Sequence, residues 1–447
     1  MTREKLQELP KDEIIEILLA VLDIVKQQAE KIAELESRLN QNSKNSSKPP
    51  SSDGFNKPQS LRERSMKKPG GQKGHKGNGL KIEREPDNVI EVQPIECPEC
   101  TQGLINQPMF HSNTKYVYDV EIKVVLNKYE IQETICPNCG VTVVGQPPED
   151  CKGTINYSSM IRALSIVMTN YGNVSIDKTH KILNDLLGVP ISSGTVKNIQ
   201  SQFAQKTVST IEEIKQKLHE SPVLNVDETG ARVAGSTQWM HVVSNSKYTL
   251  VSVHKKRGKE GSEASGVLTG YTGTLVHDCW KPYFGFDECK HALCCAHLLR
   301  ELNALIEKGF AWAMDMKALL LEMKSVVERY KNNEKEALSR YYREKFQVRY
   351  AQIINNAKAT TPISETRKKS KAENLIKRLE EYYTEIILFS IDFDVPFDNN
   401  QAERDIRNLK VKQKVSGCFR TEDGAKEYTN TASVIGTAVK CKQSVLT

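Results

Sequence analysis

Three acidic residues far apart in the sequence, Asp227, Asp278 and Glu403, have the chemistry needed to hold divalent cations. Two such ions about 3.5–4 Å apart activate water and stabilise the leaving oxygen in phosphodiester cleavage. Magnesium prefers oxygen ligands, so a few carboxylates on rigid elements are sufficient. Each aspartate alone is better explained as a strand-end cap or turn residue, so the interpretation depends on the elements that position all three.

Glu403 lies in a basic stretch, FDNNQAERDIRNLKVKQKVSG, at residues 397–417. A helix can begin there at one of three capping residues, Asp398, Asn399 or Asn400. Glu403 falls in its first turn, and cations follow on the same face at Arg407, Lys410 and Lys414. A solvated pair between Glu403 and Arg407 is the simple explanation. The alternative is that Glu403 completes a metal site while the three cations bind DNA phosphates.

The two aspartates fall in a segment whose periodicity predicts a sheet. Alternating apolar residues predict three successive strands over 223–233, 237–245 and 248–254. A polar segment at 260–271 fits a helix, and two further strands begin the segments 273–284 and 291–302, the second running into a helix. This order is that of the ribonuclease H-like fold. In that fold an acidic residue on the first strand lies beside one at the end of the fourth, and Asp227 and Asp278 occupy those places.

Four cysteines form two C-x-x-C pairs, Cys97 with Cys100 and Cys136 with Cys139. Each pair brings two thiolates onto a tight turn, and four thiolates close a tetrahedral Zn²⁺ site with no open position. The alternating segment between the pairs, 116–135, predicts two strands that would bring the pairs together. The sequence therefore predicts a zinc ribbon that binds one structural Zn²⁺.

The basic residues are concentrated in one segment of this 447-residue chain. Residues 40–85 hold eleven Lys or Arg against four Asp or Glu, a balance of +7 that equals the net charge of the whole protein. The segment is rich in Ser, Pro, Gly and Asn, which predicts a flexible linker. Such segments neutralise phosphates in salt-dependent binding to nucleic acid. A solubilising linker is the alternative. The predicted DNA contacts in this segment are Lys67, Lys68, Lys73 and Lys76.

Several features indicate a cytoplasmic protein. The eleven cysteines are odd in number and include the adjacent Cys294 and Cys295, which suits a reducing compartment. The apolar stretch 14–25 contains Glu16 and Asp23 and is too short to cross a bilayer. No signal-peptide cleavage pattern follows it. No membrane association is expected.

The N-terminal stretch also carries the spacing of a coiled-coil seam, with Gln28 as its one polar position. Self-association or packing against the chain's own body would cover this seam, whose members are Ile14, Leu18, Val21, Val25, Gln28, Ile32, Leu35 and Leu39. Further along, residues 157–218 are predicted to be helical with a break at 188–190. Within them, 193–200 would enter a major groove if the segment is a helix-turn-helix. Ordinary packed helices explain the pattern at least as well.

Several of these motifs together resemble the transposases of the insertion sequence 66 family. They are NSKNSSKPPSSD, KPGGQKGHKG, the paired C-x-x-C, VDET at 226–229, HDCWKPY at 277–283, CCAHLLREL at 294–302 and DNNQAERDIRNLKVKQKVSGCFRTEDGA at 398–425. They occur in the family's order and cover the chain to about residue 425. The role of His297 and of the Cys294–Cys295 pair is not assigned by chemistry. A core position is the simpler explanation for Trp280, although its ring could stack on a splayed base.

The resemblance implies a DDE-type transposase in which Asp227, Asp278 and Glu403 bind two catalytic Mg²⁺, with Mn²⁺ as a substitute. Asp227 would bridge both ions, while Asp278 and Glu403 each secure one. Metal-activated water would cut the element's ends, and the freed 3′-hydroxyls would attack target DNA in line. The implied partners are the terminal inverted repeats, target DNA, a second copy or more of this chain, and accessory proteins of the same element. A bacterial, nucleoid-associated location follows.

The expected architecture is multidomain α+β, with a ribonuclease H-like α/β core interrupted by a helical insertion that contacts DNA ends or the partner subunit. Its expected parts are a coiled coil (1–40), basic linker (41–88), zinc ribbon (89–150), helical DNA-binding region (151–220), first core part (221–302), insertion (303–392), and core helix with tail (393–447). The family implies a further stretch beyond SVIGTAVKCKQSVLT, which allows a truncated, poorly active copy. The rival functions are a DNA-binding repressor and a structure-selective nuclease.

Overall fold

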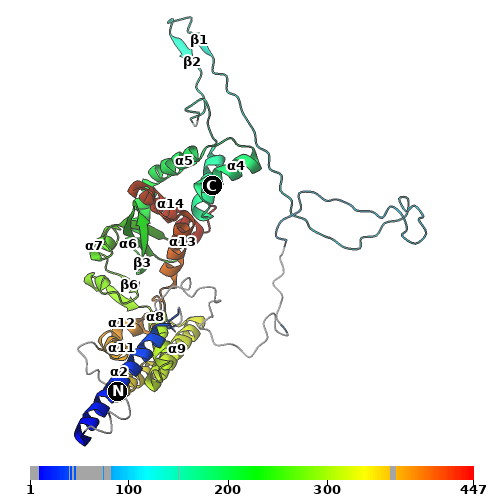
Figure 1. The fold of residues 1–447 in the computed structure, drawn as a ribbon. Coiled ribbons are helices and arrows are strands. Elements are labelled where there is room, and N and C mark those ends of the chain that lie inside the picture. The colour runs from blue at the N-terminus through cyan, green and yellow to red at the C-terminus, as the bar shows by residue number, and fades with distance from the viewer. Residues whose placement is uncertain are drawn as a thin grey trace. The chain divides into compact units, whose positions relative to one another are not determined.

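The computed structural model describes residues 10–39, 41–42, 45–46, 74, 82–149, 151–362 and 369–446. The chain forms two compact units, one of Ser60–Leu126 and one of Met1–Gln59 with Asn127–Thr447. Most of the basic linker predicted at 41–88 lies outside the described residues. The fold of the described part is mixed α/β, with one five-stranded sheet covered by helices (Figure 1).

The five-stranded sheet contains all the strands predicted for the core. They run in the spatial order β5-β4-β3-β6-β7 and are β3 (Val223–Val233), β4 (Ser236–Ser244), β5 (Thr249–His254), β6 (Thr274–His277) and β7 (Lys290–Leu293). The first three are antiparallel, whereas β6 and β7 run parallel to β3. The turn between β3 and β4 uses Ala234 and Gly235, both at positive φ, as a two-residue hairpin requires. The strand segments read from periodicity are confirmed.

Short helices connect the parallel strands. The helix predicted at 260–271 covers only the beginning of that segment, as α7 (Lys259–Glu263). The 3₁₀ helix η3 (Lys281–Gly285) lies between β6 and β7, and α8 (Cys295–Ile306) begins directly after β7. Two of the segment's three glycines, Gly266 and Gly270, adopt positive φ, which prevents the helix from continuing.

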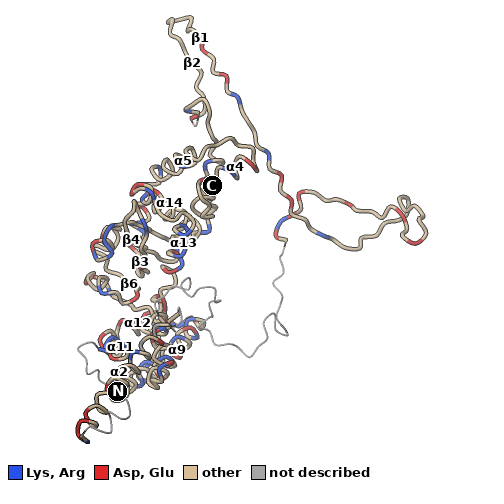
Figure 2. Tube along the Cα trace, in the orientation of Figure 1, with Lys and Arg blue, Asp and Glu red and all other residues tan. Residues whose placement is uncertain are grey.

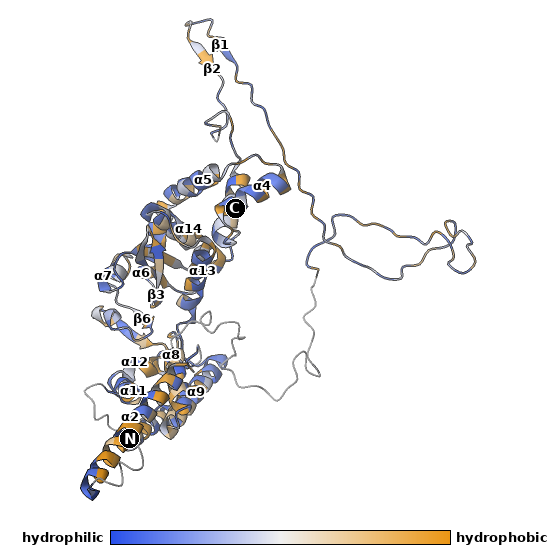
Figure 3. Cartoon of the chain, in the orientation of Figure 1, coloured by the Kyte–Doolittle hydropathy of each residue, from blue (hydrophilic) through white to orange (hydrophobic). Residues whose placement is uncertain are grey.

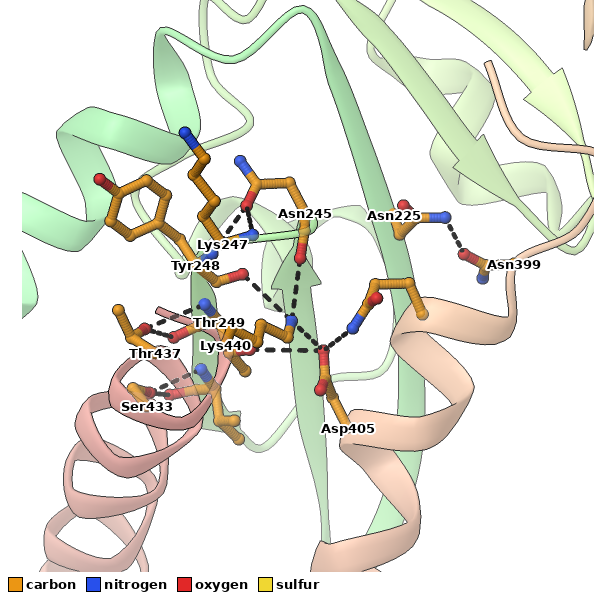
Figure 4. Close-up of polar contacts among 12 residues, drawn as sticks. Asn225, Asn245, Lys247, Tyr248, Thr249, Asn399, Asp405, Ser433, Thr437 and Lys440 are labelled. Carbon is orange, nitrogen blue, oxygen red and sulfur yellow. Dashed lines mark hydrogen bonds and ion pairs between the residues drawn. The ribbon is translucent and has the colours of Figure 1, made fainter. Parts of the chain in front are cut away.

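Two C-terminal helices pack on the sheet. Helix α13 (Asn400–Ser416) contacts β3 and β4, and α14 (Glu422–Lys440) contacts β5. Figure 4 shows how Lys440 of α14 joins these elements: its ammonium pairs with Asp405 of α13 at 2.8 Å and donates to the backbone carbonyl of Asn245 at 3.0 Å. Ser433 of α14 accepts the amide N–H of Val251 at 2.8 Å. These contacts fix α13, and therefore Glu403, relative to the strands.

The predicted helical insertion consists of four helices, α9 (Ala311–Asn332), α10 (Arg340–Thr360), α11 (Lys371–Glu381) and α12 (Tyr383–Ile391). Their apolar faces are buried in one cluster that includes Trp312, Met316 and Leu379. The same cluster contains Val276 of β6 and Leu293 of β7. The insertion and the sheet therefore share a continuous apolar core, which packs against β6 and β7.

The region 157–218 is helical, as predicted. Its elements are α3 (Ser159–Ile166), the π-helical turn η2 (Val167–Tyr171), α4 (Ile176–Leu187), α5 (Ser193–Lys206) and α6 (Val208–His219). Gly188 ends α4 in the left-handed conformation at φ 62°, at the predicted break. The Asn184 side chain exchanges hydrogen bonds with the backbone of Ile191, which fixes the turn between α4 and α5.

The N-terminal stretch forms a single helix, α2 (Lys11–Leu39), as its spacing indicated. Apolar residues recur along its length (Figure 3). Its seam is solvent-exposed: Leu18 is 59% exposed, Val25 54% and Leu39 84%. None of the described helices has the length and apolar composition required to cross a bilayer.

The strands expected over 116–135 are largely absent from this structure. Among the described residues 104–132 no strand forms. The nearest pairings are an isolated bridge between Glu96 and Gly103 and the hairpin of β1 (Glu133–Ile135) with β2 (Thr142–Val144). Side chains such as Val117, Val120 and Leu126 are exposed. An alternating pattern forms a strand only where a partner strand takes its hydrogen bonds. The two-strand prediction for this segment is therefore wrong for all but its last three residues.

Candidate active site

The parallel pairing of β3 with β6 brings Asp227 and Asp278 together. Val223 of β3 pairs with Thr274 of β6, and Asn225 pairs with Val276. The same offset, continued two residues further, sets Asp227 opposite Asp278, which directly follows β6. Neighbouring strands lie about 4.8 Å apart. Sequence reasoning placed these two aspartates side by side, and the register agrees.

Asp227 lies at the centre of a group of negative charges. Burial, followed by the charges of Glu228, Asp278 and Glu403, raises the pKa of the Asp227 carboxyl well above its usual range. Burial also raises the pKa of Asp278, although the N–H of Trp280 and the charge of Arg257 oppose that rise. Clustered carboxylates raise one another's pKa because each disfavours ionisation of the next. The structure therefore holds a partly buried negative centre between β3 and β6.

The backbone after β6 orients Asp278. Its carboxylate accepts the N–H of Trp280 at 3.1 Å, and the N–H of Cys279 donates to the ring of His277 at 3.2 Å. Cys279 itself has a φ of 72°, which non-glycine residues rarely adopt. A conformation of this kind costs on the order of 1–3 kcal/mol and persists where surrounding contacts hold it. This turn carries no signal in the sequence.

Helix α13 brings Glu403 to the same region through Asn399. The Asn399 side chain is buried, donates to the backbone carbonyl of Val226 at 2.7 Å and accepts from Asn225 at 2.9 Å, the latter shown in Figure 4. Asn399 stands at the N-cap position but makes no side-chain cap bond. The expected capping role is therefore wrong for this residue. Its amide instead ties the start of α13 to β3, one residue from Asp227.

The carboxylate of Glu403 has cationic and imidazole neighbours. Arg300 of α8 approaches one oxygen at 3.4 Å, and His297 Nδ1 lies 3.9 Å from the same oxygen. Arg407, one helical turn away, lies 4.0 Å from the other oxygen, so the simple pairing expected from the sequence is present at its distance limit. The charge of Glu403 helps to raise the pKa of Asp227, and the Glu403 carboxylate also lies beside Arg300 and His297 of α8.

The three carboxylates do not form the tightest potential metal-binding group. Among the described residues, the trio of ligand-type side chains whose atoms all lie within 4.8 Å of one another is Cys294, His297 and Glu403. Glu403 belongs to it, whereas Asp227 and Asp278 do not. The cations beside Glu403 explain its orientation, because they attract the carboxylate that the two aspartates repel.

A fourth carboxylate, Glu228, was missed by sequence reasoning. Its side chain is only 2% exposed. It accepts two hydrogen bonds from the guanidinium of Arg257, at 3.0 and 2.8 Å, and one from the hydroxyl of Tyr283 at 2.5 Å. Glu228 directly follows Asp227, and Tyr283 follows Asp278 by five residues. This closeness to the two predicted aspartates is the signal in the sequence that could have identified Glu228 and Tyr283.

Arg257 also lies against two indole rings. Its guanidinium carbon is 4.3 Å from the ring centre of Trp280 and 4.7 Å from that of Trp239. Cation–π contacts of this kind hold a guanidinium in place while leaving its donors available. Trp280 is therefore a partly buried packing partner, which is the simpler of its two expected roles.

Helix α13 carries several basic residues along its length (Figure 2). They differ in what they contact. Arg407 is 70% exposed and Lys414 is exposed. Lys410 donates to the backbone carbonyl of Gly230 at 2.9 Å. Lys412 is buried, donates to the carbonyl of Thr169 at 2.8 Å, and burial lowers its pKa to about 8. The linker lysines Lys67, Lys68, Lys73 and Lys76 lie outside the described residues.

Each C-x-x-C pair forms the same backbone turn. In the first pair, the N–H of Thr101 donates to the backbone carbonyl of Cys97 at 2.9 Å. In the second pair, the N–H of Gly140 donates to the backbone carbonyl of Cys136 at 2.9 Å. Thr101 and Gly140 both have positive φ. Backbone N–H groups, chiefly those of Cys100 and Cys139, lower the pKa of Cys97 and of Cys136 respectively. Both turns therefore have the same backbone hydrogen bond, and in both the first cysteine has a lowered pKa.

The fold and the acidic centre define a class of protein. It is a mixed α/β protein with carboxylates near the ends of parallel strands. Residues 155–427, more than half of the chain, match the family described as Transposase IS66 family. Residues 3–81 match a second family, described as a family of unknown function. No curated protein matches the chain.

The chain therefore belongs to the Transposase IS66 family, and the resemblance read from its motifs is confirmed. Membership makes it an enzyme of DNA transposition and recombination, with DNA as its partner. The matched region includes every carboxylate of the acidic centre, namely Asp227, Glu228, Asp278 and Glu403.

Proposed function

We propose that this protein cleaves the ends of its mobile element and joins the 3′-hydroxyls to target DNA, using Asp227, Asp278 and Glu403 as the ligands of two Mg²⁺. The observation that carries the proposal is that the charges of Asp278 and Glu403, 51 and 176 residues further along the chain, both raise the pKa of Asp227. Family membership gives that centre a DNA substrate.

The sheet supports the proposal through its topology. Three antiparallel strands followed by two parallel ones, in the order β5-β4-β3-β6-β7, match the arrangement of a ribonuclease H-like core. The active carboxylates of such a core lie on the first strand, after the fourth strand and on a later helix. β3, the end of β6 and α13 are those positions here, and the helices α9 to α12 stand between the second and third carboxylates.

The charge of the centre fits a divalent ion. Burial raises the pKa values of Asp227 and Asp278, and neighbouring carboxylates raise that of Asp227 further, so a divalent cation would favour the ionised form of both. Oxygen ligands suit Mg²⁺, with Mn²⁺ as a substitute. Bound ions of this type supply the positive charge that activates water and stabilises the leaving oxygen. Asp227, between the other two, would serve both ions, while Asp278 and Glu403 would each serve one.

Other residues would hold the centre and the DNA. Arg257 and Tyr283 fix Glu228 beside the aspartates, and Asn399 fixes the start of α13. Arg407 and Lys414 would bind phosphates alongside Glu403, because exposed cations on one helix face suit a polyanion. The 3′-hydroxyl would then attack a target phosphodiester in line, with no covalent protein intermediate.

A structural Zn²⁺ held by Cys97, Cys100, Cys136 and Cys139 remains a prediction from the sequence. Each pair by itself forms the turn of a metal-binding knuckle, and backbone N–H groups lower the pKa values of Cys97 and Cys136. Four thiolates leave no open position, so this ion would take no part in cleavage. Helix-turn-helix binding through α5 and accessory proteins of the element remain predictions from the sequence.

The test uses Glu403→Gln, which keeps the shape of the side chain and removes its charge. With Mg²⁺ and DNA containing the element's ends, we expect cleavage to fall by about 1,000-fold or more, the loss typical when charge stabilisation is removed. End binding should stay within a few-fold of that of the unaltered protein. Glu260→Gln, a surface change on α7, is the matched control and should leave both measurements unchanged.

The products separate this function from its rivals. Joined strands are expected from a transposase, cuts without joining would indicate a structure-selective nuclease, and salt-sensitive binding alone would indicate a repressor. An equal loss of binding and cleavage in Glu403→Gln would show that Glu403 is architectural.

A further inference from the structure

Beside the acidic centre lies a second group of ligand-type side chains. Cys294, the residue before α8, and His297, in its first turn, stand near Glu403 of α13, and their ligand atoms all lie within 4.8 Å of one another. Cys294 is buried, while the side chains of His297 and Glu403 are 25% and 20% exposed. The group therefore combines a buried sulfur with two partly exposed side chains.

We infer that Cys294, His297 and Glu403 form a binding site for a transition-metal dication of the Zn²⁺ class, distinct in ligand chemistry from the proposed Mg²⁺ centre. Thiolate and imidazole are the ligands that Zn²⁺ selects, whereas Mg²⁺ selects oxygen. Three protein ligands would leave a fourth position open. The inference goes beyond the proposed function, which assigns no role to Cys294 or His297.

The spacing of these ligands is compatible with coordination. Zinc bonds of about 2.3 Å to sulfur and 2.0 Å to nitrogen place tetrahedral ligand atoms about 3.5 Å apart. His297 Nδ1 already lies 3.9 Å from the Glu403 carboxylate. Small side-chain rotations would close the remaining distance. Cys294 and His297 are three residues apart at the start of α8, so both project from one turn of the backbone.

His297 presents a ligand atom that its surroundings do not satisfy. Its Nδ1 is buried, and no hydrogen-bond partner for it occurs among the residues that the structure describes. Buried polar atoms are normally hydrogen-bonded, so this nitrogen needs an explanation. Burial, with the charges of Arg300 and Arg378, lowers the pKa of His297 to about 3, which keeps the ring in its neutral, metal-binding form.

Cys294 is also placed to become a thiolate when a cation arrives. Its sulfur accepts the N–H of Asn399 at 3.1 Å, a contact that stabilises negative charge on sulfur. It stands at the N-cap of α8, where the helix dipole favours an anion. Coordination of a cation by this sulfur would replace the thiol proton, which passes to solvent.

Arg300 would compete with a bound metal ion for the Glu403 carboxylate. It lies 3.4 Å from the Glu403 oxygen that faces His297, so an incoming cation would displace that contact. Glu403 is the residue that the two centres share. If the proposed Mg²⁺ function holds, a Zn²⁺-class ion bound here would draw Glu403 away from Asp227 and inhibit cleavage.

The test measures metal binding in the full chain, independently of activity. Zn²⁺ bound per chain is determined after equilibration with a metal-buffered solution, and Co²⁺ spectra report thiolate coordination. We expect Cys294→Ala and His297→Ala each to bind one equivalent less than the unaltered protein at concentrations that fill both sites. Loss of one ligand should weaken this site by at least 10–100-fold, the cost of removing even an outer partner.

Controls separate this site from the predicted zinc ribbon and from misfolding. Cys295→Ala alters the neighbouring buried thiol, whose sulfur contacts backbone carbonyls of Leu293 and Ile386, and should retain the full stoichiometry. Glu403→Gln should weaken the same equivalent. An unchanged stoichiometry and Co²⁺ spectrum in a folded Cys294→Ala protein would overturn the inference. A loss in Cys295→Ala equal to that in Cys294→Ala would do so as well, because it would reflect structure and not ligation.

Discussion

At the scale of single residues, burial and like charge decide the behaviour of the acidic centre. Asp227 is surrounded by Glu228, Asp278 and Glu403, and its raised pKa means that ionisation costs free energy in the folded protein. Because the folded pKa exceeds the usual 3.8, the favourable contribution present at low pH is lost as the pH rises through the folded value. The metal-free protein is therefore strained electrostatically at neutral pH.

We expect Asp227→Asn to stabilise the metal-free protein while abolishing cleavage. A gain of about 1 kcal/mol, usual when a functional strain is relieved, corresponds to about 2–4 °C for a domain of 150–250 residues. The measurement is thermal unfolding with a chelator at pH 7 and again near pH 4, where the gain should vanish. Asp185→Asn, an exposed change on α4, is the control and should give no gain at either pH. A destabilised Asp227→Asn protein at pH 7 would contradict the electrostatic account.

At the scale of elements, the site depends on how α13 is attached to β3. Asn399 connects them through the backbone of Val226 and the side chain of Asn225. Lys440 and Asp405 connect α13 with α14 and with the backbone near β5. Residues 422–440, expected only as part of a C-terminal tail, thus form a helix that supports the third carboxylate.

We expect Asn399→Ala to destabilise the protein by about 1–3 kcal/mol, because it leaves buried polar partners unsatisfied. Cleavage should fall as well, since Glu403 loses its fixed position. Denaturant unfolding and the cleavage rate measure the two effects. Asn400→Ala alters the next residue and should change neither substantially. Equal effects of the two variants would show that Asn399 has no special positioning role.

At the scale of the whole molecule, α2 carries a long row of exposed apolar side chains. Its seam residues Leu18, Val25 and Leu39 are exposed in this structure, although a coiled coil would bury them. We propose that a second copy of this chain covers the seam. Two copies would allow one assembly to hold both ends of an element.

We expect Leu18→Glu to reduce the oligomeric mass of the protein in solution, because it sets a charge in the seam. Light scattering coupled to size exclusion measures that mass. Gln27→Glu adds the same charge away from the seam and should leave the mass unchanged. A protein that is monomeric before substitution, or a Leu18→Glu protein of unchanged mass, would show that α2 does not drive self-association.

Local patterns were sufficient to predict much of the fold. Period-two alternation predicted β3, β4 and β5, and motif order indicated the family that the comparison confirms. The strands predicted from alternation do not form over 104–132. A strand also needs a neighbouring strand to take its hydrogen bonds, and an alternating pattern does not identify that neighbour. The catalytic roles and metal ligands remain proposals.

The sequence by itself determined the elements, the family and which acidic residues to consider, because periodicity and motifs are local properties of the chain. Only the tertiary structure decided which side chains surround those residues. Glu228, Arg257, Tyr283 and Asn399 acquire their roles through contacts between strands and helices 29 to 173 residues apart. The proximity of Cys294 and His297 to Glu403 likewise depends on packing α8 against α13, which no spacing along the chain specifies.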